Sequence, residues 1–138
     1  MIATDDSKFG TPEVNVGLWP MMIGALIFRN VPRKKAMDMI LTGRRVHAEE
    51  ALSMGLVSRV VPSGTLDEEV RAVATELAGK SPIGIRLGKE AFTQAEGMGL
   101  EESLKFLAAK IADVASTDDA REGILAFVEK RRPEFKGR

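Results

Sequence analysis

The chain has 138 residues, the length of one ordinary domain, and its 44% hydrophobic and 29% charged residues are typical of a globular protein. Its 20 basic and 20 acidic residues cancel, which excludes a global field that would attract nucleic acid or an anionic membrane. The absence of cysteine excludes disulfides and thiol chemistry, and the single histidine, His47, excludes a histidine-built metal site. We therefore expect no metal and no nucleic-acid partner.

The N-terminus predicts a cytoplasmic protein. Asp5, Asp6 and Lys8 precede any apolar stretch of useful length, which is unlike the basic and then apolar layout of a signal peptide. The most apolar window, residues 21–28, is far too short to span a bilayer. We expect no association with a membrane.

The first informative stretch is residues 9–20, where one carboxylate, Glu13, has mainly apolar neighbours. Pro12 suits the first position of a helical turn, so Glu13 would lie beside unpaired backbone N–H groups. Gly10 and Gly17 bracket this turn and allow a positive φ or a close approach of the backbone to another group. Two interpretations stay open: Glu13 is a general acid or base in a dry site, or it only complements a helix dipole.

The remaining segments are predicted to be mainly helical. Residues 21–28 are apolar on every face, which favours a helix enclosed by protein, and Met21 and Met22 either shape a pocket or fill the core. A short strand is expected at 58–61, ended by a proline. Apolar periodicity and cap residues predict further helices at 33–42, 48–54, 66–78, 82–96, 100–114 and from 118 onwards.

Several helix starts have a cap residue in the sequence. His47 precedes the helix at 48–54, and Thr65 with Glu68 has the spacing of a capping box. Ser81 is placed before Pro82, and Thr117 stands with Asp118 and Asp119 before the last helix. We expect these side chains to bind free amides at the helix starts.

The helix at 100–114 has a continuous apolar stripe that one small domain does not cover by itself. The stripe consists of Leu100, Leu104, Leu107, Ala108, Ile111 and Val114. Exposed apolar surface of this extent usually marks an interface. We expect a homo-oligomer rather than a monomer.

The end of the chain combines aromatic rings with cations. Phe127 and Phe135 accompany Lys130, Arg131, Arg132, Lys136 and Arg138. Aromatic faces beside cations suit a nucleotide base and its phosphates. The alternative is a solvated basic tail at the C-terminus of a helix.

In order, these segments resemble the enoyl-CoA hydratase/isomerase (crotonase) superfamily. Phe-Gly-x-Pro-Glu-x-x-x-Gly-x-x-Pro, from Phe9 to Pro20, is similar to the second active-site segment of that family and places Glu13 at its second glutamate. Matches that cover nearly the whole chain follow in the family's order: Leu41-Thr42-Gly43, Ala48-x-x-Ala51-x-x-x-Gly55-Leu56-Val57, Val60-Val61-Pro62, Lys89-Glu90, Asp118-Asp119-x-x-Glu122-Gly123 and Phe127-x-Glu129-Lys130-Arg131-x-Pro133-x-Phe135.

The resemblance implies a mainly α fold: the end of a ββα spiral with short strands in residues 1–62, followed by a helical trimerisation region in residues 63–138. It implies an acyl-CoA substrate, no separate cofactor, and a trimer or hexamer. Glu13 would be catalytic, and Phe127 with Lys130 would bind the CoA of the same or of a neighbouring subunit. The substrate pocket would include Pro12, Gly17, Trp19, Pro20 and Met21. Met21 and Met22 stand where the family often has glycines, so the acyl chain length does not carry over.

The resemblance begins midway along the family's chain. The half that precedes this point in the family supplies the donors that polarise the thioester carbonyl, the first catalytic glutamate and most of the CoA groove. We therefore expect the 138 residues to be inactive by themselves. Three functions stay open: hydration of a 2-enoyl-CoA, isomerisation of an enoyl-CoA double bond, and a non-catalytic helical interaction module.

Overall fold

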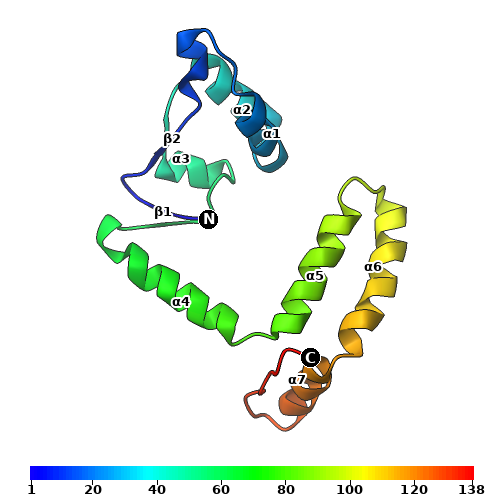
Figure 1. Cartoon of the computed structure of the whole chain (residues 1–138). Coiled ribbons are helices and arrows are strands. Elements are labelled where there is room, and N and C mark those ends of the chain that lie inside the picture. Colours follow the sequence, from blue (N-terminus) through cyan, green and yellow to red (C-terminus); the bar gives the residue numbers. More distant parts are fainter. The chain divides into compact units, whose positions relative to one another are not determined.

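The computed structural model describes all 138 residues, which form seven α-helices, four short strands and two 3-10 turns (Figure 1). The strands are β1 (Ile2–Thr4), β2 (Lys8–Phe9), β3 (Val46–His47) and β4 (Arg59–Val61), and the 3-10 turns are η1 (Pro12–Val16) and η2 (Ser63–Thr65). The helices are α1 (Met21–Asn30), α2 (Arg33–Thr42), α3 (Ala48–Ser53), α4 (Leu66–Ala78), α5 (Pro82–Ala95), α6 (Leu100–Ala115) and α7 (Asp118–Val128). The prediction of a mainly helical chain with few short strands is confirmed.

The chain divides into two compact units, Met1–Ala72 and Val73–Arg138, here called unit 1 and unit 2. The division lies inside α4, whereas the sequence places the boundary between residues 62 and 63. The assignment of a spiral end to residues 1–62 and of an oligomerisation role to residues 63–138 stays a prediction.

Two pairs of short strands organise unit 1. β1 lies parallel to β4, with Ile2 opposite Arg59, and β2 lies antiparallel to β3, with Phe9 opposite Val46. Because β2 leads directly into η1, the pairing of Phe9 anchors the chain just before the turn that contains Glu13.

A hydrophobic core holds unit 1 together. From α2 it takes Ala36 and Met39, and Ile40 beside them is also fully buried, which confirms that this face of the helix points inward. The other members of the core come from β1, α1, β3, α3 and the loops that follow α1 and α3: Ala3, Ile27, Val31, Val46, Ala51, Met54 and Val57. The turn is thus attached to a packed support.

The prediction of a buried helix over residues 21–28 is wrong for this chain. α1 forms there, but Met21 and Met22 are 74% and 88% exposed, and only Gly24 and Ile27 are buried. α1 packs on α2, so one face is covered while the rest of its apolar surface faces outward. The exposure also excludes Met21 and Met22 as core residues of this chain.

Unit 2 is an assembly of three helices with few buried residues. α5 and α6 lie side by side in opposite directions, and α7 packs against both (Figure 1). Only Ala91, Asp119 and Ala126 are buried, whereas Leu100, Leu104 and Ile111 of the predicted stripe are 60% exposed or more. Much of the stripe is therefore uncovered within this chain.

The predicted caps form at two of the helix starts. Ser81 Oγ accepts a hydrogen bond from the Gly84 N–H at 3.0 Å, and Thr117 Oγ1 accepts one from the Ala120 N–H at 3.1 Å. At the other two starts the predicted bonds are wrong. His47 stands at the N-cap of α3 as expected but makes no side-chain cap bond, and the Thr65 hydroxyl donates to the Pro62 carbonyl instead of binding an amide of α4.

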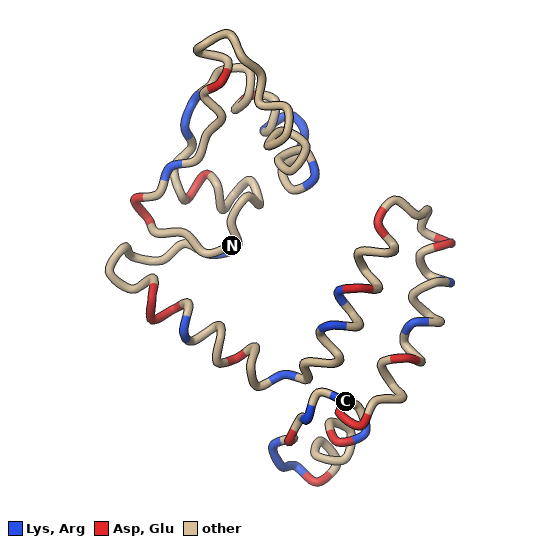
Figure 2. Tube along the Cα trace, in the orientation of Figure 1, with Lys and Arg blue, Asp and Glu red and all other residues tan.

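Basic and acidic residues are both spread along the whole trace (Figure 2). This agrees with the zero formal net charge. None of the helices combines the length and the apolar character that crossing a membrane requires.

Candidate active site

The turn that carries Glu13 is a 3-10 helix with Pro12 in its first positions. Its end is closed by Gly17, whose φ of 78° lies in the left-handed region that glycine adopts without steric cost. The Gly17 N–H donates to the Val14 carbonyl, and the Leu18 N–H donates to the Glu13 carbonyl at 3.0 Å. The predicted helical turn between Gly10 and Gly17 is thus confirmed.

The turn lies directly on the C-terminal end of α2. A Cβ atom at Gly43 would stand 2.8 Å from the Asn15 side-chain amide and 2.9 Å from a Val14 methyl carbon. A Cβ atom at Gly10 would stand 3.0 Å from the Arg44 carbonyl oxygen. The segment after α2 therefore approaches the chain closely on both sides of Glu13, at the Gly10 backbone and at the Val14 and Asn15 side chains.

Arg44 braces this support. Its guanidinium donates two hydrogen bonds to the Glu50 carboxylate, at 2.9 and 2.7 Å, and one from Nε to Asp38 Oδ2 at 2.9 Å. The bonds from Arg44 lower the pKa of Glu50 and, with those to Asp38, raise the pKa of Arg44. These bonds of the Arg44 guanidinium connect α2, through Asp38, with α3, through Glu50, next to the contact between Gly43 and the turn.

The Glu13 side chain is half-buried, and one of its oxygens is enclosed. Oε2 is buried without a hydrogen-bond partner in the chain, and the same is true of Oγ1 of Thr11, two residues earlier. Buried polar atoms are nearly always paired, so two unpaired oxygens in one turn indicate a place where another polar group binds. Thr11 is a residue that the sequence analysis missed.

The residues predicted to form a substrate pocket belong to this turn and to the segment that leads from it into α1. Pro20 is buried, whereas Pro12, Gly17, Trp19 and Met21 are exposed, Trp19 by 43% and Met21 by 74%. The Met21 N–H donates to the Trp19 carbonyl at 2.8 Å, which keeps the start of α1 close to the turn. The pocket assignment stays a prediction.

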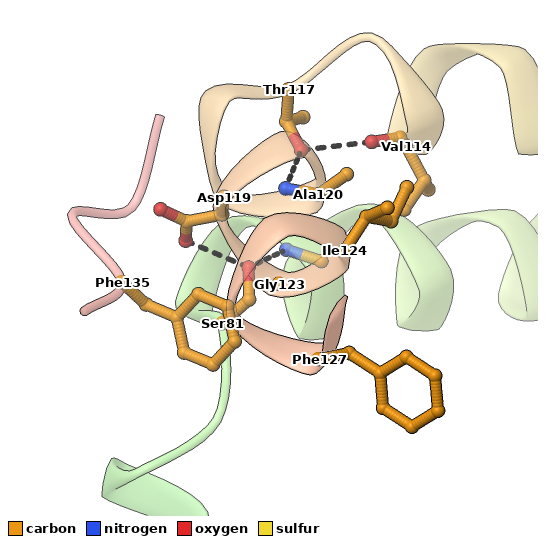
Figure 3. Close-up of a pocket in the computed structure, with 10 residues that line it drawn as sticks. Ser81, Val114, Thr117, Asp119, Ala120, Gly123, Ile124, Phe127 and Phe135 are labelled. Carbon is orange, nitrogen blue, oxygen red and sulfur yellow. Dashed lines mark hydrogen bonds between the residues drawn. The ribbon is translucent and has the colours of Figure 1, made fainter. Parts of the chain in front are cut away.

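Phe127 lies at a separate pocket in unit 2. This pocket of about 370 Å³ is mainly apolar and is lined by residues of α5, α6, α7 and the C-terminal tail, including Gly84, Val114, Ile124, Phe127 and Phe135 (Figure 3). Phe127 is 84% exposed. An exposed ring beside an apolar hollow is suited to stack against a flat ligand.

The tail that brings Phe135 to this pocket is held by Asp119, a carboxylate that is 2% exposed. Asp119 accepts hydrogen bonds from the Lys136 N–H at 2.7 Å, from the Gly137 N–H at 3.1 Å and from the Ser81 hydroxyl at 2.8 Å. The Asp119 N–H in turn donates to the Arg138 carbonyl. Asp119 thus fastens the tail instead of capping α7, which the sequence analysis did not foresee.

Lys130 has an unusual backbone conformation. Its φ of 54° is positive, and no other residue of the chain besides glycines has a positive φ. The Arg131 N–H donates to the Ala126 carbonyl and the Lys130 N–H to that of Phe127, so Lys130 occupies the position after α7 where helices usually have glycine. A lysine kept in such a place is a reason to look for a role of its side chain.

Comparison with known proteins agrees with the resemblance found in the sequence. The sequence model described as enoyl-CoA hydratase/isomerase matches residues 1–138, the whole chain. The chain belongs to this family. Its side chains form no cluster of three or more histidine and acidic residues that could hold a metal ion.

Curated members of the enoyl-CoA hydratase/isomerase family align over almost all of this chain. A putative enoyl-CoA hydratase of Thermus thermophilus is 40% identical over 135 residues, which are 98% of this chain and 53% of the relative. A probable enoyl-CoA hydratase of Mycobacterium bovis is 43% identical over 139 residues, which cover 100% of this chain and 54% of that protein. The chain spans about half the length of the curated relatives it matches.

Solved structures of the family have the same fold. An enoyl-CoA hydratase of Mycobacterium smegmatis superimposes with a TM-score of 0.94 at 36% identity and covers 97% of this chain and 52% of that one. Human enoyl-CoA hydratase domain-containing protein 3 gives a TM-score of 0.93 at 39% identity over 97% of this chain and 53% of that one. The predicted fold, the end of a crotonase-type spiral followed by helices, is confirmed.

Proposed function

We propose that this chain supplies the C-terminal part of an enzyme that hydrates a 2-enoyl-CoA, with Glu13 as one of its two catalytic carboxylates. The observation that carries the proposal is the Glu13 turn: a carboxylate with one buried, unpaired oxygen, fixed by Gly17 and Gly43, in a chain that matches the hydratase/isomerase family from end to end.

In such a hydration, two carboxylates orient a water molecule and exchange protons with it and with the substrate, while N–H donors stabilise the enolate that develops on the thioester. Glu13 would hold the water or move a proton at the double bond. The resemblance assigns the second carboxylate and the enolate donors to the half of the family's chain that this sequence does not match. The reaction therefore needs both halves.

Phe127 and Lys130 of unit 2 would bind the CoA part of a substrate. Phe127 exposes its ring beside the pocket of unit 2, and Lys130 adds a cation from a conformation that favours glycine. A ring and a cation next to each other suit an adenine base and its phosphates. The CoA would belong to the same subunit or, as in the resemblance, to a neighbour.

The decisive experiment compares Glu13→Gln with the unchanged complete gene product that carries this chain, using hydration of a short 2-enoyl-CoA. We expect turnover to fall by at least ~100-fold, the scale of a lost general acid or base, with little change in CoA binding. Glu49→Gln is the matched control, because Glu49 is exposed in the first turn of α3. Unchanged turnover in Glu13→Gln would remove Glu13 from the mechanism.

An isomerase remains the second candidate, because one carboxylate at the Glu13 position is enough to move a proton between two carbons. Supplying the same protein with a 3-enoyl-CoA separates the two reactions. Formation of the 2-enoyl-CoA with no hydrated product would favour the isomerase.

A non-catalytic helical module is the candidate from another class. The observation that motivates it is that the chain spans only about half of the length of each of these relatives. We expect the purified 138 residues to show no hydration by themselves, because the assigned enolate donors lie outside them. Robust activity of this short chain would contradict the proposed division of labour.

We further propose a trimer or hexamer that works in the cytoplasm, in fatty acid metabolism. The exposed apolar residues of α6 and α7, among them Leu104, Ile111, Ile124 and Val128, support an interface in unit 2. Analytical ultracentrifugation at micromolar concentration tests this. A stable monomer would contradict it.

A further inference from the structure

Thr11 lies at a helix start, where a threonine hydroxyl usually caps a free backbone amide, but the Thr11 hydroxyl does not do so. It is the N-cap residue of η1, and its side chain makes no cap hydrogen bond. An N-cap hydroxyl usually accepts a hydrogen bond from an amide in the first turn, as Thr117 does from the Ala120 N–H at the start of α7. The Thr11 hydroxyl is therefore available for another partner.

The surroundings of Thr11 make this arrangement unfavourable unless such a partner exists. Thr11 is 2% exposed, and its Oγ1 is buried without a hydrogen bond. A buried hydroxyl without a partner loses its hydration and gains nothing in return. Valine has the same shape and would fill the place without this loss, so packing by itself does not explain a threonine.

The other unpaired buried atom belongs to Glu13, two residues further along the chain. Among all 138 residues, two buried side-chain oxygens or nitrogens have no partner, Thr11 Oγ1 and Glu13 Oε2, and both belong to the start of one turn. The Val14 and Asn15 side chains of this turn pack so closely on Gly43 that an added Cβ would come within 3 Å of both, so the turn does not shift freely to satisfy the two atoms. A hydroxyl can donate and accept, whereas an ionised carboxylate only accepts, so one water molecule can satisfy both.

We propose that Thr11 is a positioning residue for the Glu13 carboxylate. One water molecule bridges its hydroxyl and Glu13 Oε2. This bridge fixes the buried Oε2 so that the other carboxylate oxygen, Oε1, faces the reacting atoms. The catalytic part of this inference rests on the proposed function. The hydrogen-bonding part concerns the chain itself and is testable without activity.

The first test measures stability of the 138-residue chain by thermal unfolding. Thr11→Val should leave the midpoint nearly unchanged, because the hydroxyl that it removes is bound to a water molecule and to no group of the protein. Thr117→Val is the matched control and should lower the midpoint, since the Thr117 hydroxyl accepts from Ala120 and donates to Val114. A loss in Thr11→Val as large as in the control would show a structural hydrogen bond and overturn the proposal.

The second test measures kinetics in the complete gene product. Thr11→Val should lower kcat by about 10-fold, which is less than the ~100-fold expected for loss of the acid–base group itself, and should change KM by less than about threefold. Thr11→Ser keeps the hydroxyl and should restore most of the turnover. A variant whose kcat is normal, or whose serine form is as slow as the valine form, would overturn the proposal.

A double variant shows whether Thr11 acts through Glu13. If it does, Thr11→Val combined with Glu13→Gln should be no more than about threefold slower than Glu13→Gln, because groups that act as a unit are not additive. A full product of the two single losses would mean that Thr11 acts independently of Glu13. Full activity of Glu13→Gln would overturn the proposed function, whereas an impaired Glu13→Gln beside an unaffected Thr11→Val would overturn only the coupling.

Discussion

Units 1 and 2 are stabilised in different ways. Unit 1 has a contiguous hydrophobic core with nine buried members, among them Ile27, Met39 and Met54. Unit 2 is of similar length, but Ala91 and Ala126 are its only buried hydrophobic residues, and its most buried charged group is Asp119. Packed side chains stabilise unit 1. Unit 2 is stabilised by the pairing of its helices and by the hydrogen bonds between Asp119 and the C-terminal tail, here called the clasp.

The difference shows which parts of the candidate sites are rigid within the chain. The turn with Glu13 lies on packed backbone from α2, so its geometry is supported inside unit 1. The ring of Phe127 stands on a helix whose apolar side chains are largely exposed, and its pocket is completed by a hydrogen-bonded tail. Variants that remove one kind of support should separate the two units.

The largest effect is expected from Met39→Ala. Met39 is 1% exposed in the core of unit 1, and removing its side chain leaves a cavity that costs roughly 2–5 kcal/mol. Urea unfolding with hydrogen exchange should locate the loss in residues 1–72. Leu104→Ala in unit 2 is the control and should cost far less, because Leu104 is 60% exposed. Equal losses would contradict the distinction between the units.

Gly43→Ala should cause the next largest loss of stability. The φ of Gly43 is +59°, which costs an alanine about 1–2 kcal/mol, and the new Cβ would collide with Asn15 and Val14 of the turn. Gly64→Ala is the control because no heavy atom lies within 4 Å of its added Cβ. We expect lower thermal stability and slower turnover only for Gly43→Ala. A neutral result would show that the turn is not held as described.

Asp119→Asn tests the clasp of unit 2. Burial opposes the charged form of Asp119, but the hydrogen bonds from Lys136, Ser81, Gly137 and Arg138 outweigh it and hold the pKa below its usual value. Asparagine cannot accept from all of these donors, so hydrogen exchange at the Lys136 and Gly137 amides should accelerate with little change in unit 1. Asp67→Asn, an exposed aspartate in the first turn of α4, is the control. Unchanged exchange would contradict the clasp.

The smallest predicted effect is a pH dependence confined to unit 2. Hydrogen bonds from the Arg131 side chain, and from the Glu134 N–H, lower the pKa of Glu122 from 4.5 to about 2. The stabilisation by this carboxylate is therefore present above pH 4.5 and is lost as the pH falls towards 2. In Glu122→Gln, thermal midpoints should depend less on pH in this window. An unchanged slope would contradict the assignment.

Much of the local structure follows from the sequence because it depends on neighbours along the chain. The periodicity of apolar residues predicts α2 and α4, and the caps at Ser81 and Thr117 form as expected. Pro12, Glu13 and Gly17 predict the turn by their spacing, and the order of motifs predicts the family. The catalytic role of Glu13 stays a prediction.

Only the tertiary structure decided the features that join distant residues. Thr11 looks like an ordinary cap in the sequence, and its unpaired hydroxyl is visible only in the packed turn. Gly43 and Asn15 meet across 28 positions, and Asp119 reaches amides 17 and 18 residues away. α1 is apolar enough to be buried, yet its exposure depends on which neighbours the chain supplies. Local patterns encode propensity, whereas burial and partner choice depend on contacts that no short stretch of sequence contains.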